Sequence, residues 1–213
     1  MRRTLLAAAP IAVAVGVFGV SFGVLARQVQ IPGWAAVLMS ALVFAGSAQF
    51  AAVAILAAGG GVVAAILAGA LLNLRYLAVG AAVAPVLPGG PLRRVLLGQL
   101  VVDESYVLGV AAGEAGRPDT RTVLTTGALL YGCWVLGTIV GVLLGPLFGD
   151  PKRLGLDAAF PALFVALLWP MLTTRRAIRA AVAGGAAGLI LAPFTPPGVP
   201  LAVAAVVGLL VSQ

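Results

Sequence analysis

Apolar runs long enough to cross a bilayer recur along the whole of this chain. The run Leu5–Ala26 has 22 residues and no charge, and a membrane-spanning helix needs about 20 apolar residues. Of the 213 residues, 62% are hydrophobic and 9% are charged, whereas about a quarter of a soluble domain is charged. A water-soluble fold cannot hide this much apolar surface. We therefore expect a polytopic integral membrane protein in an inner cell membrane.

Proline, glycine and charged residues divide the chain into segments that predict an all-α membrane helical bundle. We expect about 7–8 helices, some of them short or broken, in a single transmembrane domain over residues 1–213. The expected segments are Leu5–Ala26, Gly33–Ala58, Val62–Val83, Leu92–Ala112, Thr122–Leu144, Ala158–Leu172 and a proline-broken tail, Ala180–Ser212. A weak likeness between the first three segments and the last three indicates a possible internal repeat.

The first segment has two interpretations. Two arginines precede its apolar run, as in a signal peptide, but the run is longer than the usual 7–15 residues, so we interpret it as a membrane helix. Its Gly19, Ser21 and Gly23 predict local unwinding of the kind transporters use to expose backbone groups. Gly137 and Gly141, also four residues apart, predict close packing of the fifth segment against another helix.

Several function classes are disfavoured by what the chain carries. Its net charge is +7, yet no basic run exceeds two residues and no aromatic residues interleave with it, so nucleic acid is not an expected partner. The chain has no histidine and one cysteine, Cys133. Histidine-based catalysis and the usual zinc sites therefore require residues that are missing. We expect neither an enzyme nor a bound metal or cofactor.

Three ionisable residues stand inside apolar segments: Arg75, Asp103 and Glu104. A charge at bilayer depth costs about 2.5–3.5 kcal/mol on insertion scales, so each is a functional hypothesis. We expect one carboxylate to pair with Arg75 and the other to remain available for a proton or a substrate ammonium. The alternative is that Arg75 and a carboxylate form only a buried ion pair.

Neutral polar residues accompany these charges. Ser47 and Gln49 lie in the second segment, and Asn73 and Tyr76 flank Arg75 in the third. A glutamine in hydrocarbon needs partners for its amide. Ser47 and Gln49 therefore either line a substrate pocket or join helices through hydrogen bonds.

At these residues the chain resembles the AzlC family, the large subunit of bacterial branched-chain amino acid exporters. The resemblance is carried, in order, by Val43–Phe50, Asn73–Tyr76, Val102–Ser105 and Ala159–Leu163. The family often has histidine at the position of Tyr76 and threonine at that of Ser105.

The resemblance implies export of leucine, isoleucine, valine or a similar hydrophobic amino acid, driven by proton exchange. It also implies a small hydrophobic partner subunit of the AzlD type. A zwitterion needs an acceptor for its ammonium, which Asp103 or Glu104 can supply, and donors for its carboxylate. Two other functions stay open on the residues alone: a passive channel or facilitator, and a membrane accessory subunit with no transport role.

Overall fold

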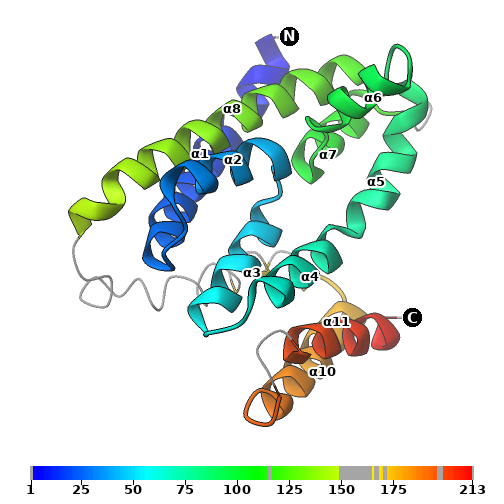
Figure 1. Ribbon diagram of the computed structural model, residues 1–213. Helices are drawn as coiled ribbons and strands as arrows, with labels where there is room; N and C mark the ends of the chain where they lie inside the picture. The colour runs from blue at the N-terminus through cyan, green and yellow to red at the C-terminus, as the bar shows by residue number, and fades with distance from the viewer. Residues whose placement is uncertain are drawn as a thin grey trace. The chain divides into compact units, whose positions relative to one another are not determined.

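The computed structural model describes residues 2–114, 117–148, 165, 168–169, 172–195 and 199–212. Regular structure in these ranges is helical, and its β content is one isolated bridge between Glu114 and Arg117. The all-α prediction is therefore confirmed (Figure 1). The elements are α1 (Arg2–Gln28), α2 (Gly33–Val43), α3 (Gly46–Ala57), α4 (Val62–Asn73), α5 (Arg75–Val83), η1 (Ala84–Val86), α6 (Pro91–Gly98), α7 (Asp103–Ala112), α8 (Thr120–Leu144), η2 (Gly145–Phe148), α10 (Arg175–Leu191) and α11 (Val199–Val211).

The chain forms two compact units. Unit 1 comprises Met1–Gln49 and Leu72–Leu147, and unit 2 comprises Phe50–Leu71 and Phe148–Gln213. Unit 1 holds both long helices and every residue predicted to form the site. In unit 2, α10 and α11 pack closely. Gly184 of α10 lies so near α11 that a Cβ added to it would stand 2.7 Å from the carbonyl oxygen of Ala204. The predicted single transmembrane domain stays a prediction.

Two long helices, α1 and α8, lie side by side and form the frame of unit 1 (Figure 1). Glycines on both helices let the backbones meet: a Cβ on Gly19 would stand 2.6 Å from the Trp134 carbonyl, and one on Gly141 would meet the Val20 carbonyl. The close packing predicted for the fifth segment is confirmed. The unwinding predicted near Gly19 is wrong, because α1 is continuous and its glycines face α8 instead.

Three segments predicted as continuous helices are broken. Gly33–Ala58 divides into α2 and α3 at Phe44, whose φ of 41° is left-handed. Val62–Val83 divides into α4 and α5 at Leu74. Leu92–Ala112 divides into α6 and α7, which are bent by 107° across Gln99–Val102. Local sequence marks these breaks weakly, since none of the three contains a proline, and their causes lie in contacts described below.

The described helices include two that are long and apolar enough to cross a membrane, Ala8–Gln28 and Thr120–Leu144. Counting each bent pair as one span, α4 with α5 and α6 with α7, raises the number to four. The tail is split as predicted, into α10 and α11. The predicted stretch Ala159–Leu163 lies outside the described residues, as does most of the predicted segment Ala158–Leu172.

Side-chain caps begin two of these helices. The Thr122 backbone N–H donates to Asp119 Oδ2 at 2.7 Å, which caps α8, and the Ala177 N–H donates to Thr174 Oγ1 at 3.1 Å, which caps α10. The hydroxyl of Thr122 and then its backbone N–H hold the pKa of Asp119 below the ordinary value for an aspartate. Asp119 immediately precedes the part of α8 that could span a membrane, so its carboxylate lies at one end of that span.

Candidate functional site

The three helix breaks of unit 1 meet through contacts between their polar residues. Ser47 follows the α2–α3 break, Arg75 follows the α4–α5 break, and Asp103 follows the α6–α7 break. Arg75 bonds both of the others, as described next. Broken helices leave backbone groups without intrahelical partners, and at membrane depth such groups are tolerated only inside protein or beside an aqueous cavity. The sequence-predicted residues are thus gathered at one place by the breaks.

Arg75 is the centre of this cluster. Its Nη1 lies 2.8 Å from Asp103 Oδ2, and its Nη2 donates to Ser47 Oγ at 3.0 Å. The guanidinium carbon stands 5.1 Å from the centroid of the Tyr76 ring, within the range of a cation–π contact. Side chains of α3, α5 and α7 therefore contact one guanidinium, and each of its terminal nitrogens makes one of these contacts.

The two adjacent carboxylates have different surroundings. Both begin α7, where the positive end of the helix dipole favours negative charge. Asp103 is paired with Arg75, whereas Glu104 is exposed and has no ion-pair partner among the described residues. The predicted pairing of one carboxylate with Arg75 is confirmed, and the availability of the other for a proton or a substrate ammonium stays a prediction. The side chains of Arg75 and Asp103 are 42% and 39% exposed, so the chain itself buries this pair only in part, and a role of Arg75 beyond pairing stays a prediction.

Hydrogen bonds from side chains to backbone stabilise the breaks. Ser105, fully buried, accepts from the Val102 N–H at 2.9 Å and donates to the Val102 carbonyl at 2.9 Å. Gln99 Nε2 lies within 3.1 Å of the carbonyls of Ala41 and Leu42, near the end of α2. Gln99 therefore joins the α6–α7 break to the α2–α3 break.

Tyr131 and Gly127 bring α8 to the same two breaks. The Tyr131 hydroxyl donates to the Ala41 carbonyl at 3.0 Å, and its ring packs edge-on against Phe44, with centroids 5.2 Å apart. A Cβ on Gly127 would meet the Leu100 carbonyl, so this glycine lets the α6–α7 break approach α8. The frame of unit 1 thereby supports the site directly.

Gln49 belongs to a buried network rather than to an open pocket. Its Nε2 donates to Ser40 Oγ at 3.0 Å, and its Oε1 accepts from Trp134 Nε1 at 3.1 Å. Ser40 in turn lies 2.8 Å from Thr138 Oγ1. Gln49, Ser40 and Thr138 have no exposed surface. For Gln49 the structure favours the second alternative, hydrogen bonding between helices, whereas Ser47 contacts Arg75.

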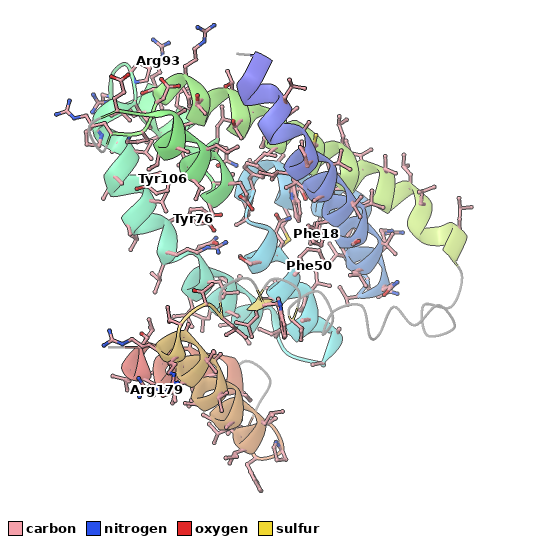
Figure 2. The ribbon with its side chains drawn as sticks, turned by 180° about the vertical axis from the view of Figure 1, so that it is seen from behind. Phe18, Phe50, Tyr76, Arg93, Tyr106 and Arg179 are labelled. Carbon is pink, nitrogen blue, oxygen red and sulfur yellow. The ribbon has the colours of Figure 1, made fainter. Side chains whose placement is uncertain are left out.

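A cavity of about 450 Å³ lies beside the cluster in unit 1, within the range of small-molecule sites, about 300–1,000 Å³. Most of its wall is apolar, and Asn73 and Tyr76 are among its polar residues (Tyr76 is labelled in Figure 2). It is lined by Val43, Phe44, Asn73, Tyr76, Gly80, Val83, Ala84, Leu87, Arg94, Val95, Gly98, Gln99 and Val101. Because the Tyr76 ring also contacts Arg75, the cavity and the charged cluster share a wall.

Asn73 has an unusual position for an amide. Its Oδ1 is buried and has no hydrogen-bond partner among the described residues, as is also true of Thr126 Oγ1. Buried acceptors normally have partners, because an unsatisfied one costs free energy. Asn73 lines the cavity through other atoms, whereas Thr126 does not line it, and the unmet acceptor of Asn73 is itself enclosed by protein.

Metal-binding geometry is not found in the described part of the chain, where no group of three or more His, Cys, Asp or Glu residues is close enough to hold an ion. Asp103 is paired with Arg75, which also contacts Ser47 and Tyr76. The groups that this arrangement offers to a ligand are carboxylates, a guanidinium and hydroxyls.

Several site residues were not predicted. Gln99, Tyr131 and Arg94 were missed because their roles depend on breaks and on a cavity that a helical periodicity does not reveal. A signal was present for Gln99, since a glutamine in an apolar segment needs partners. Trp134 and Thr138 gave no signal, because both are ordinary in a membrane helix.

Residues 10–148, which include all of these site residues, match the AzlC protein family. This chain belongs to the AzlC family. The family resemblance first seen in short motifs is thereby confirmed over more than half of the sequence.

Relatives of this AzlC chain include membrane proteins of bacteria and archaea. An uncharacterized membrane protein of Archaeoglobus fulgidus is 32% identical over 82% of this chain and 77% of its own length. Uncharacterized membrane proteins of two Helicobacter pylori strains are 25% identical over 70% of this chain, which spans 65% of their length. No solved structure matches the chain. Together with the apolar helices, these relatives identify a membrane protein.

Proposed function

We propose that this AzlC chain is a transporter, not an enzyme, which exports a branched-chain or similar hydrophobic amino acid across an inner cell membrane in exchange for protons. The observation that carries the proposal is the pairing of Asp103 with Arg75, which leaves the adjacent Glu104 without an ion-pair partner among the described residues, in a unit that also contains a largely apolar cavity. Family membership supports the substrate class.

Charge balance explains how exchange would work. Arg75, Asp103 and Glu104 together carry one net negative charge, and a charge at bilayer depth costs about 2.5–3.5 kcal/mol. Either a proton on Glu104 or a substrate ammonium near it removes that charge. Once the proton or the ammonium has neutralised that charge, the second is no longer needed, so the proton and the substrate bind in alternation. Alternate binding of two solutes to one site couples their movement in opposite directions.

The broken helices support transport over a static role. Discontinuous helices with polar residues at their breaks are the usual construction of transporter sites, since their free backbone groups bind substrate and ions. Unit 1 has three such breaks joined by Arg75 and Gln99. An accessory subunit would need neither the breaks nor the cavity.

The deciding experiment measures leucine and valine transport in proteoliposomes containing the full chain together with a small AzlD-type subunit. An imposed proton gradient should drive uphill amino acid movement, and a protonophore should abolish it. Equilibration without uphill movement would identify a passive facilitator. No transport of any amino acid in a panel, from a folded complex, would leave the accessory role.

A further inference from the structure

The two long helices of unit 1 run in the same direction. Gly16 of α1 lies beside Cys133 of α8, and further along the contact Gly23 lies beside Gly141. Because the residue numbers rise together along both helices, α1 and α8 are parallel, and Figure 1 shows them beginning at the same end of the pair. We call this end, where both helices begin, the starting end.

Helices α6 and α7 enter and leave unit 1 at the starting end. Before α6, the Thr120 hydroxyl donates to the Val86 carbonyl at 2.9 Å, which places this part of the chain beside the start of α8. Near the end of α7, the Gly109 carbonyl accepts from the Asp119 N–H at 2.8 Å. Between these points the α6–α7 break touches α8 at Gly127, about 10 Å along the helix from Thr120. The pair α6–α7 is therefore re-entrant and does not cross from end to end.

The bend between α6 and α7 turns α6 across the starting end. The two helices are bent by 107°, and α7 runs back along α8, where a Cβ on Gly109 would meet the Val123 side chain. Since α8 is a candidate membrane span, a helix turned this far from α7 lies closer to the membrane plane than to its normal. That is the orientation of an interfacial amphipathic helix.

One face of α6 is apolar and exposed. Leu92, Val95 and Leu96 are 74%, 71% and 65% exposed, and residues spaced by three and four share a helix face. The other side of α6 is attached to the protein, because Leu97 packs against a buried cluster that includes Val123 of α8. The apolar face of α6 thus points away from the core of unit 1.

Arginines gather around this apolar face at the starting end. Arg93 and Arg94 lie on α6, Arg117 lies just before α8, Arg121 lies in the first turn of α8, and all four are exposed. Figure 2 shows Arg93 at the outer edge of unit 1. Two acidic residues in 114–119 accompany the four arginines, so their summed charge is positive.

The opposite end of the α1–α8 pair carries little charge. In the described part of unit 1 its charged residue is Arg27, whose Nη1 donates to the Ile31 carbonyl at 3.2 Å. Two more arginines, Arg2 and Arg3, begin α1 at the starting end. Arginine and lysine are enriched in the cytoplasmic loops of membrane proteins, and the cytoplasmic leaflet carries anionic lipids.

We propose that the starting end faces the cytoplasm and that α6 lies in the bilayer interface, where it binds anionic phospholipid headgroups. The apolar face of α6 enters the acyl chains, and Arg93, three residues from Leu96 and so beside that face, binds a lipid phosphate through its guanidinium. A phospholipid matches both the charge and the apolar face, whereas a neutral membrane helix matches only the latter. Neither step depends on the proposed function, because orientation and lipid binding are independent of substrate and coupling.

Lipid preference is measured by native mass spectrometry of the full chain with phosphatidylglycerol or phosphatidylcholine. The wild type should bind phosphatidylglycerol more tightly. Arg93→Gln should weaken that binding about fivefold and leave phosphatidylcholine binding unchanged, whereas Arg93→Lys should keep most of it. Arg27→Gln removes one charge from the opposite end and should behave as the wild type does. Equal binding of both lipids by the wild type, or equal effects of Arg93→Gln and Arg27→Gln, would overturn the lipid site.

A spin label on the apolar face distinguishes lipid from a protein partner. Leu96→Cys in a Cys133→Ala background, labelled with a nitroxide in vesicles containing phosphatidylglycerol, should lie about 5–10 Å below the headgroups by its accessibility to oxygen and to a nickel complex. Its mobility should not change when the small AzlD-type subunit is added. Immobilisation by that subunit would make the face a protein interface and overturn lipid docking.

The orientation is tested by labelling intact and permeabilised cells with a membrane-impermeant maleimide. Gly90→Cys reports on the starting end, where an added Cβ would meet nothing within 4 Å, and Gln28→Cys reports on the opposite end. Both variants carry Cys133→Ala. Gly90→Cys should react only after permeabilisation, and Gln28→Cys should react in intact cells. The reverse pattern would place the starting end outside the cell and overturn the proposal.

Discussion

At the scale of single residues, the pair Asp103 and Glu104 shows how neighbours in sequence acquire different roles. Both lie in the first turn of α7, but a single contact, Asp103 with Arg75, neutralises one of them. Removing one partner of an ion pair leaves the other charge uncompensated, whereas removing both is often tolerated. Substitution of Asp103 should therefore affect the stability of the fold, whereas substitution of Glu104 should affect transport.

Glu104→Gln should abolish proton coupling without loss of the fold. The neutral amide imitates the protonated acid, so leucine exchange between equal concentrations should persist while uphill transport falls about tenfold or more. Transport in proteoliposomes with and without a proton gradient measures both. Normal uphill transport by Glu104→Gln would remove this residue from the coupling mechanism.

Asp103→Asn should instead lower the thermal unfolding temperature, because it leaves Arg75 without its carboxylate. Combining it with Arg75→Gln should restore much of that temperature, since no charge is then left alone. Thermal unfolding of the purified single and double variants, followed by circular dichroism, tests this. A double variant less stable than Asp103→Asn would contradict the expectation.

Asp119→Ala should destabilise the start of α8 by about 1 kcal/mol near neutral pH, the usual effect of losing an N-cap. Because hydrogen bonds from Thr122 lower the pKa of Asp119 in the folded protein, this contribution is full above the unfolded pKa, about 3.9. It disappears as the pH falls through the lower folded pKa. Unfolding of wild type and variant at neutral and acidic pH should converge at acidic pH, and a constant difference would contradict the cap.

At the scale of helices, position in the sequence and position in the fold agree for the long elements and disagree for the broken ones. Length and hydrophobicity predicted α1 and α8 well, because a continuous apolar run has few alternatives in a membrane. The breaks at Phe44, Leu74 and Gln99 could not be predicted, since they depend on distant partners such as Tyr131 and Asp103.

The candidate site, like the helices, could be predicted from the sequence only in part. The pairing of Arg75 with one carboxylate was predictable, because the cost of an isolated charge demands a partner. The burial of Gln49 was not predictable, since a glutamine amide can find hydrogen-bond partners either in a substrate pocket or in a buried network. The positions of Ser40 and Trp134 decide between these two environments.

Gly141→Ala should destabilise the α1–α8 contact, because the added Cβ would meet the Val20 carbonyl. Overpacking of this kind costs about 1–3 kcal/mol. Gly132→Ala on the same helix is the control: its Cβ would meet nothing within 4 Å, and alanine favours a helix over glycine by about 1 kcal/mol. Thermal unfolding should fall for the first variant and hold or rise for the second, and equal behaviour would contradict the close contact.

At the scale of the whole molecule, family membership and apolar surface direct attention to a second subunit. Large aliphatic side chains are exposed along α4, including Val63, Ile66 and Leu67. Lipid can cover such surfaces, and so can another membrane helix. We expect the small AzlD-type subunit to be required for transport.

Co-expression tests this requirement. Cells expressing the chain with a small AzlD-type subunit should export labelled leucine, and cells expressing either protein alone should not. Purification through a tag on the larger chain should recover both subunits. Full export by the larger chain alone would show that the small subunit is dispensable.

The glycine contact between α1 and α8 also limits how unit 1 can change shape. Where backbones touch with no side chains between them, there are no rotamers to rearrange, so sliding would force carbonyls and Cα atoms into collision. The two long helices, α1 and α8, must then move together as one rigid body. If the proposed transport requires unit 1 to change shape, we expect the change in the short helices α5, α6 and α7, which end at the breaks.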